Sequence, residues 1–291
     1  MTIARAPIDR SALISIAVLL LLALACILVP LFAAQDPLAI GDVLSRRLLP
    51  PFSRDDAGAL HVLGTDRFGL DLFVRMMLAG RISLAVGIAG SVVAATLGTL
   101  VGAVAAWRGG WLDRMLMGAA DVLLAIPRLV LLLVCAALWQ PGLTTVVAVL
   151  IATGWMGVAR MIRAEVLGIN AQPYVQSAVA LGVRPWRVLW RHALPNALGP
   201  AIVAMTLGVG NAILLESGLS FLGLGIQPPR PSWGNMIAGG RDLIVTAPWV
   251  AVAPGLALIL TVLAATLIGD SLRDRLAGER ASLRRDLADR A

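Results

Sequence analysis

Side chains that could catalyse a reaction are few and scattered in this sequence. All 24 basic residues are arginine, which excludes the lysine of a phosphate-binding nucleotide loop and the lysine that forms Schiff bases. The two histidines, His61 and His192, lie far apart, whereas a histidine-based metal site needs clustered ligands. Cys26 and Cys135 lie inside apolar runs, where cysteine is typically a small buried side chain. The sequence therefore predicts neither nucleotide chemistry nor a metal site in this chain.

Three residues within the apolar stretch 115–138 could act inside a membrane. Asp121 and Arg128 are ionisable, and such groups within a membrane-spanning helix are functional candidates. We expect Asp121, which lies near one end of the stretch, to serve at a subunit interface or as a helix cap. Pro127 lacks the amide proton of a helical hydrogen bond, so it predicts a helix break. The break is either a static kink or a hinge that gates a pathway.

The elements that must position these residues are membrane-spanning helices. The chain has 291 residues, 59% hydrophobic and 14% charged, with a mean hydropathy of +0.87, whereas soluble domains are about 45–50% apolar and about 25% charged. A helix needs about 20 apolar residues to cross a bilayer. The first apolar run loosely resembles a lipoprotein signal around Cys26, but its length favours a retained anchor. We predict an all-α membrane protein with six transmembrane helices, at 12–33, 82–106, 115–138, 143–161, 197–215 and 248–270.

The arginines predict which side of the membrane each loop occupies, because positive charge accumulates on the cytoplasmic side. If both termini are cytoplasmic, 15 of the 24 arginines lie in the internal segments 1–10, 107–114, 160–196 and 271–291. The external segments hold 8 arginines, balanced by 8 acidic residues. We therefore predict an N-in, C-in topology, in which the net charge of +7 lies beside membrane lipid and requires no nucleic-acid partner.

Two external segments are longer than the roughly 2–8 residues that usually connect bundle helices. Segment 34–81 predicts an external lobe, and its end, 64–80, has the apolar spacing of an amphipathic helix lying on the membrane surface. Segment 216–247 is interrupted by glycine and proline and predicts a re-entrant or lid-like external loop. The predicted division is a cytoplasmic N-terminus, a first helix, the lobe, a five-helix core and a cytoplasmic tail: 1–11, 12–33, 34–81, 82–270 and 271–291.

The internal segment 162–196 has the strongest local signals. Pro173 suits the first turn of a helix, and Gly182 suits its left-handed end. Pro185 suits the first turn of a second short helix, which is predicted to run to about Ala193 before Pro195 ends it. The segment is rich in arginine and aromatic residues. This composition predicts either an amphipathic elbow that rests on lipid headgroups or a knob that docks a protein. The residues alone leave both interpretations open.

Three motifs, in the same order along the chain, resemble those of a known family of membrane proteins. Gln176-Ser177-Ala178, followed by Gly182 and then by His192-Ala193-Leu194-Pro195, resembles the EAA loop of ATP-binding-cassette importer permeases, although Gln176 stands where Glu is usual. The run from Gly64-Thr65-Asp66 to residue 84 resembles the signature of C-type permeases for dipeptides, oligopeptides and nickel. Residues 219–234 resemble the outer loop of the same subfamily. The resemblance covers residues 64–270.

The resemblance implies a permease subunit of an ATP-driven, binding-protein-dependent importer in a bacterial inner membrane. Di- or oligopeptides are the first expected substrates, and nickel or another small solute is the alternative. The implied partners are a homologous B-type permease subunit, two ABC ATPase subunits that hold ATP and Mg, and an external substrate-binding protein. No cofactor is expected in this chain itself.

Within that family, the EAA loop forms coupling helices that seat in a groove of the ATPase. The residues implied to couple to the ATPase are Tyr174, Gln176, Ser177, Ala178, Gly182, Arg187, His192, Leu194 and Pro195. The residues implied for the external loop or gate are Phe221, Gly223, Gly225, Pro228, Pro229 and Trp233.

Two other classes of protein remain as alternatives to a permease without enzymatic activity. An ion-coupled secondary transporter would carry acidic residues near the middle of several spans, whereas Asp121 is the only acid well inside a predicted span. A membrane enzyme would cluster polar side chains on one face of its spans, and this sequence scatters them. Both are weaker interpretations of the sequence.

Overall fold

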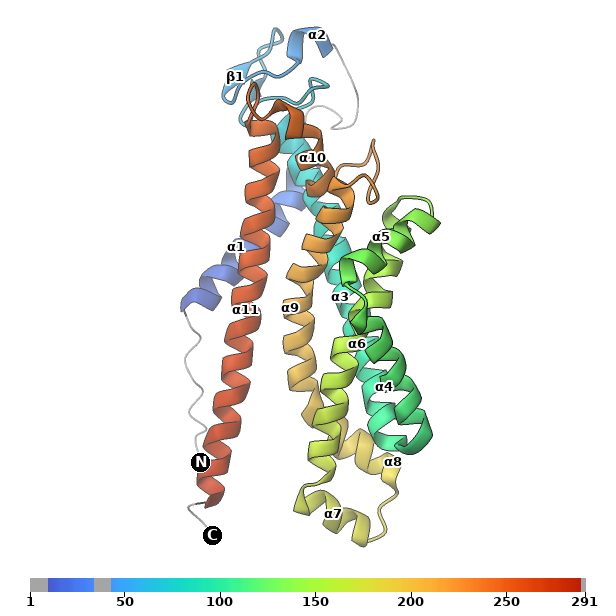
Figure 1. Cartoon of the computed structure of the whole chain (residues 1–291). Coiled ribbons are helices and arrows are strands. Elements are labelled where there is room, and N and C mark those ends of the chain that lie inside the picture. Colours follow the sequence, from blue (N-terminus) through green and yellow to red (C-terminus); the bar gives the residue numbers. More distant parts are fainter. Residues whose placement is uncertain (1–9, 34–42, 289–291) are drawn as a thin grey trace.

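The protein is built mainly from long apolar helices (Figure 1). In this computed structural model the described residues are 10–33 and 43–288. Five helices of this part are long and apolar enough to cross a membrane. They are α1 (Arg10–Leu28), α3 (Leu72–Arg108), α6 (Leu143–Asn170), α9 (Leu194–Phe221) and α11 (Trp249–Ala288). The predicted all-α membrane fold is confirmed.

The third predicted span, 115–138, is divided between two shorter helices. α4 (Gly110–Ala125) and α5 (Arg128–Leu138) together cover the apolar stretch 115–138, and both pack against α6. Between them Ile126 is extended, with φ −82° and ψ 128°, and Pro127 precedes α5. A residue before proline is kept out of the helical region, and proline lacks the amide proton that a continuing helix needs. The predicted helix break is therefore present, and the stretch predicted as one span forms two helices.

The central helix of the bundle is α3, which packs against both α6 and α9. Gly98 and Gly102 of α3 lie directly against the backbone of α6. A Cβ atom on these glycines would stand 2.5 Å from the carbonyl oxygen of Trp155 and 2.3 Å from that of Ala159, respectively. Small residues at this spacing let two helices approach closely. On the other side of the bundle, α11 packs against α9 and α1.

One end of the bundle carries a small lobe, at the top of Figure 1. The described part of the lobe contains α2 (Val43–Arg46) and two short antiparallel strands, β1 (Ser53–Arg54) and β2 (Leu60–His61). Beside the lobe lie α10 (Trp233–Gly240) and the single 3-10 turn η2 (Arg241–Leu243), which follow α9 and lead into α11. The lobe and α10 together cover this end of the bundle.

The prediction of an amphipathic surface helix over 64–80 is wrong. Residues 64–71 form a loop, and α3 begins at Leu72 and continues without interruption through the predicted second span to Arg108. Leu72, Met76 and Met77 are only 0%, 7% and 3% exposed because they pack into a core cluster with residues of other helices. The apolar side of this segment therefore faces protein, and its periodicity is that of an ordinary bundle helix.

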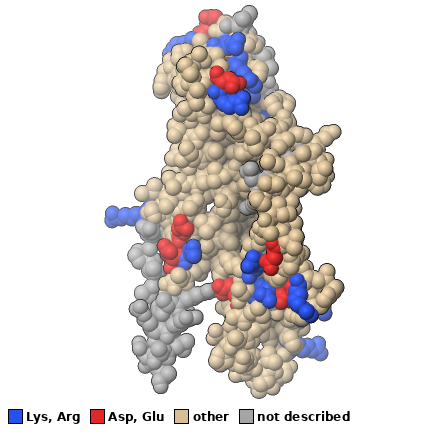
Figure 2. Space-filling view, viewed as in Figure 1, with Lys and Arg blue, Asp and Glu red and all other residues tan. Residues whose placement is uncertain are grey.

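On the face shown in Figure 2, charged side chains gather on the lobe and in a second zone that lies below the middle of the molecule. The surface between these two zones is almost entirely uncharged. Within the spans, aliphatic side chains point outward: Leu20 and Leu21 of α1 are 66% and 73% exposed, and Ile259 of α11 is 60% exposed. An uncharged aliphatic band of this kind is the surface expected of segments that lie in lipid.

Candidate functional site

The internal segment predicted to form a knob folds into two short helices at the end of the bundle opposite the lobe (Figure 1). α7 (Pro173–Ala180) follows α6, and α8 (Pro185–Val188) follows α7. Pro173 and Pro185 occupy the first turns of these helices, as predicted. Proline suits this place because the first-turn amides have no helical partner and the φ of proline is already helical.

Gly182 ends α7 in the left-handed conformation, with φ +83°. The amide of Gly182 donates to the carbonyl of Val179 at 2.9 Å, and the amide of Val183 donates to that of Ala178 at 3.1 Å. These bonds satisfy carbonyls at the end of the helix, and only glycine adopts this φ without a steric penalty. A Cβ at Gly182 would meet no atom within 4 Å. The need for glycine is therefore purely conformational, and the predicted left-handed stop is confirmed.

The two short helices have a buried face and an exposed face. Val175, Val188 and Leu189 are 2%, 4% and 5% exposed. Four large side chains of this segment, which together we call the docking face, are half exposed or more: Tyr174 (51%), Leu181 (85%), Trp186 (50%) and Trp190 (52%). Several large apolar groups exposed on one short segment are typical of a contact with protein or membrane.

The other predicted coupling residues lie on or beside this face. Gln176, Ser177 and Arg187 are exposed, Ala178 is half-buried and Leu194 is buried. The side chain of His192 lies outside the described residues, although its backbone is part of a helical turn.

The prediction that Pro195 ends the second short helix is wrong. α8 continues through the π-helical turn η1 (Leu189–Ala193) directly into α9, and Pro195 lies in the first turn of α9. Proline cannot form the usual helical hydrogen bond, and the wider π turn before it accommodates that loss. An unbroken helical path therefore joins Trp186 and Trp190 of the docking face to a membrane-crossing helix.

Two ion pairs tie α4 to α6 in the same half of the bundle (Figure 1). Arg163 of α6 donates two hydrogen bonds to the carboxylate of Asp113 in α4, at 2.5 and 2.6 Å. Asp121 of α4 pairs with Arg160 of α6 at 3.1 Å, and both side chains are 58% exposed. Arg128 is the first residue of α5, and its side chain lies outside the described residues. Sequence reasoning missed both pairs, because only the packing of α4 on α6 brings the partners together.

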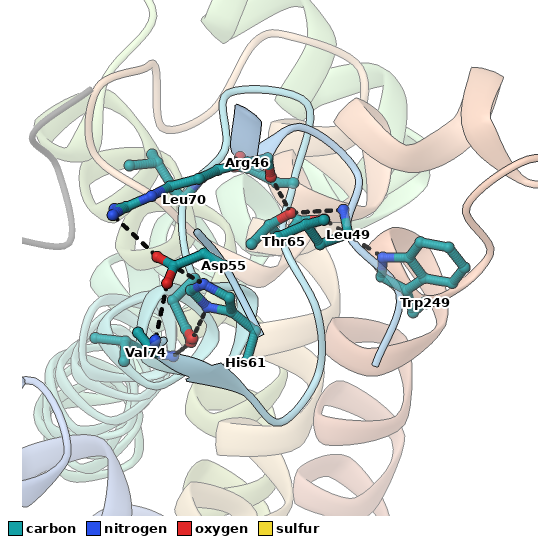
Figure 3. A network of polar contacts seen from close by, with 11 residues as sticks. Arg46, Leu49, Asp55, His61, Thr65, Leu70, Val74 and Trp249 are labelled. Carbon is teal, nitrogen blue, oxygen red and sulfur yellow. Dashed lines mark hydrogen bonds and ion pairs between the residues drawn. The ribbon is translucent and has the colours of Figure 1, made fainter. Parts of the chain in front are cut away.

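A polar network holds the lobe together at the opposite end (Figure 3). Nδ1 of His61 lies 2.7 Å from an oxygen of Asp71, and Nε2 of His61 lies 3.6 Å from an oxygen of Asp55. Asp55 also pairs with Arg46 at 2.9 Å. The other oxygen of Asp71 accepts the amide of Val74 at 3.0 Å and so caps the N-terminus of α3. The lobe is thus fastened to the start of the central helix.

The charged surroundings of Asp55 favour its ionised form. Burial acts to raise the pKa of the carboxyl group, but the hydrogen bond from the amide of Ala59, together with Arg46 and His61, outweighs burial. The pKa of Asp55 is therefore lower than its ordinary value.

The motif that resembles the permease signature builds the loop between the lobe and α3. Oγ1 of Thr65 donates to the carbonyl of Arg46 at 2.5 Å and accepts the amide of Leu49 at 2.8 Å. The carbonyl of Thr65 accepts the indole N–H of Trp249 at 3.3 Å, which joins the loop to the first turn of α11 (Figure 3). Asp66 forms an ion pair with Arg75 of α3. In this chain the motif seats the lobe on α3 and α11.

The predicted external-gate residues begin at the end of α9. Phe221 is the last residue of that helix, so the predicted external loop 216–247 starts inside it. Gly223 follows in a turn with φ +78°, and Gly225 is buried against the end of α9. Pro228 and Pro229 are exposed and are joined by a cis peptide bond.

Trp233 is a core residue, although it was predicted to belong to an external gate. It begins α10 and is 0% exposed. Its indole N–H donates to the carbonyl of Met76 in α3 at 3.1 Å, and its ring packs in a core cluster with Leu72 and Cys26. The external segment is therefore a folded cap on the bundle, and the re-entrant loop predicted as one possibility is not what forms.

The fold and the docking face define a membrane-spanning transport component: apolar helices cross the bilayer, and one continuous helical path leads from an exposed contact surface into them. The chain belongs to the family of binding-protein-dependent transport system inner membrane components, whose sequence profile matches residues 98–279. This range contains α6, the docking face, α9 and α10, so the match includes the whole of segment 162–196. The chain is therefore an inner-membrane permease component of such a transport system.

Two relatives match most of the chain. A protein of Brucella suis biovar 1 that carries the name of a peptide permease is 38% identical over 268 residues, which are 91% of this chain and 86% of that protein. A glutathione transport system permease protein of Pectobacterium atrosepticum is 40% identical over 216 residues, which are 74% of this chain and 72% of that protein.

Proposed function

We propose that this chain forms half of the translocation pathway of an ATP-driven importer for di- or oligopeptides. The relatives named for peptide and for glutathione, which is a tripeptide, support this substrate class. A homologous B-type permease forms the other half of the pathway. Because this chain has no lysine for a nucleotide loop, two partner ATPase subunits bind ATP and Mg. An external binding protein delivers the peptide at the lobe end.

The observation that carries the proposal is the unbroken helical path from the docking face into the membrane. Trp186 lies in α8, Trp190 lies in η1, and both are half exposed on a segment that continues into α9. ATPase subunits that bind these two side chains from the cytoplasm move α9 directly when they change conformation. The Asp113–Arg163 ion pair makes α4 follow α6 in the same movement. The result is a rigid-body switch between two packings of the bundle.

The proposed topology places the docking face in the cytoplasm and the lobe outside. The C-terminal end of α11 lies at the same end of the molecule as α7, and the lobe lies at the other end (Figure 1). This arrangement supports the N-in, C-in topology that the arginine distribution predicts.

Uptake by the reconstituted complex tests the proposed function. Proteoliposomes that contain this chain, the B-type permease and both ATPases should import a labelled tripeptide only with binding protein outside and ATP inside. A nickel chelate offered in parallel distinguishes the alternative cargo. Uptake that continues without ATP and collapses when an uncoupler is added would refute the proposal in favour of an ion-coupled transporter.

A further inference from the structure

A buried carboxyl group joins the external segment to the bundle. Glu216 lies in the last turns of α9 and is 0% exposed. A carboxyl group at such a site is costly unless hydrogen bonds compensate for the lost water. Ser83 of α3 donates to one oxygen of Glu216 at 3.0 Å, and Ser220 of α9 donates to the other at 2.7 Å. Ser217 of α9 donates a longer hydrogen bond, of 3.4 Å, to the oxygen that Ser83 also contacts.

Ser83 and Ser220 each also accept a backbone amide from the segment that follows α9. The amide of Ile226 donates to Ser220 at 3.0 Å, and the amide of Trp233 donates to Ser83 at 3.3 Å. Ser232, the N-cap of α10, separately accepts the amide of Asn235 at 3.3 Å. A hydroxyl group has one proton and two lone pairs. With their protons directed at Glu216, Ser83 and Ser220 keep their lone pairs for the amides. The carboxyl group therefore sets the direction of the Ser83 and Ser220 hydroxyls, which hold the external backbone in place.

Close packing reinforces this attachment. A Cβ atom on Gly234 would stand 2.3 Å from the carbonyl oxygen of Ser217, so α10 touches the backbone of α9 directly. The side-chain amide of Asn235 donates to the carbonyls of Ile226 and Arg230 at 3.0 and 2.9 Å. These contacts join the parts of the segment to one another and attach the segment to α9.

We infer that Glu216 is a positioning residue that makes the external segment 222–240 a rigid extension of α3 and α9. The segment moves together with these helices when the pathway opens, and it does not swing separately as a lid. The consequence for transport rests on the proposed function, whereas the attachment itself is a property of this chain.

Hydrogen–deuterium exchange of the full-length chain in lipid nanodiscs tests the attachment without requiring transport. Glu216→Ala should raise the exchange rates of the Ile226 and Trp233 amides by about tenfold or more, because hydrogen bonds involving a carboxylate are among the stronger ones. Glu216→Gln keeps the size of the side chain but replaces one acceptor oxygen with a donor, so it should give a smaller increase.

Single serine variants keep the test decisive if the Glu216 variants fail to fold. Ser83→Ala should raise exchange at the Trp233 amide alone, and Ser220→Ala at the Ile226 amide alone. Ser91→Ala is the matched control, since Ser91 is also buried on α3 and donates to a carbonyl of α9 at 2.5 Å, outside this network. Unchanged exchange in both network variants, or equal increases in the Ser91 variant, would overturn the inference.

A transport measurement separates the attachment from its consequence. Uptake by the assembled complex should fall in the Glu216→Ala variant if the segment must move with α3 and α9. Normal uptake by a variant whose external amides exchange rapidly would overturn the role of the attachment in transport. A wild-type complex that imports nothing would refute the proposed function and leave the exchange result standing.

Discussion

Valine in place of Gly182 should separate ATP hydrolysis from transport. The backbone at this residue has φ +83°, a conformation that costs an L-residue about 1–2 kcal/mol, and a β-branched side chain is stiffer still. Nothing lies within 4 Å of the place where Cβ would stand, so this strain is the whole cost and the bundle is undisturbed. Since 1.4 kcal/mol corresponds to a factor of ten in an equilibrium constant, the population of the native turn relative to distorted conformations falls roughly tenfold.

Uptake of a labelled tripeptide and ATP hydrolysis, measured on the same proteoliposomes, check this prediction. The Gly182→Val variant should insert and assemble like the wild type and continue to hydrolyse ATP, while its uptake falls roughly tenfold. Gly168→Val is a matched control, because Gly168 is an exposed residue inside α6 whose added side chain would also meet no atom within 4 Å. Normal uptake by the Gly182 variant would refute the role assigned to this turn.

Three further predictions concern contacts at the two ends of the bundle. Asp113→Asn breaks the two-bond ion pair between α4 and α6 and should lower the midpoint of thermal unfolding by about 2–4 °C, more than Asp121→Asn does in its exposed pair. Arg81→Ala removes the hydrogen bonds that the guanidinium donates to carbonyls at the C-terminal end of α1, so a protease should cleave α1 faster. Because the folded pKa of Asp55 is lowered, ionised Asp55 stabilises the folded protein fully above its unfolded pKa of about 3.9, and this stabilisation is lost as pH falls through the folded pKa. The midpoint of thermal unfolding should therefore drop in that pH range, and it should drop less steeply in Asp55→Asn.

Each of these predictions has a result that would contradict it. Equal midpoints for the Asp113 and Asp121 variants would show that the two-bond geometry of the first pair adds nothing. Unchanged cleavage of α1 in the Arg81 variant would mean that apolar packing alone holds this helix. The same acid dependence in wild type and in the Asp55 variant would assign the effect to other carboxyl groups.

Local backbone geometry was predictable from the sequence where one residue type decides it. Pro173 and Pro185 fixed the starts of two helices, Gly182 fixed a left-handed turn, and Pro127 fixed a break. Each of these residues restricts or frees φ by its own covalent structure, so the surrounding fold has little influence. The helical structure of the long apolar runs was equally predictable, because a helix satisfies all of its backbone hydrogen bonds internally when it lies in lipid.

Features that depend on packing between distant segments were not predictable in the same way. Residues 72–80 have the pattern of a surface helix, and only the core around Trp233 reveals that their apolar side is buried by protein. Pro195 indicates a helix end, but the π turn before it lets the helix continue. Glu216 was counted as an external charge, although the serines near it in the sequence, Ser217 and Ser220, were a signal that it could be buried and satisfied.

The most direct test of the central claim asks which side of the membrane the docking face occupies and what it contacts. Leu181 is 85% exposed on that face, so Leu181→Cys, in a chain whose native cysteines are replaced by alanine, gives an accessible probe. A membrane-impermeant maleimide should label this cysteine only after the membrane is permeabilised, and a bifunctional reagent should cross-link it to the ATPase subunit. Labelling of intact cells, or the absence of any cross-link to an ATP-hydrolysing protein, would contradict the account.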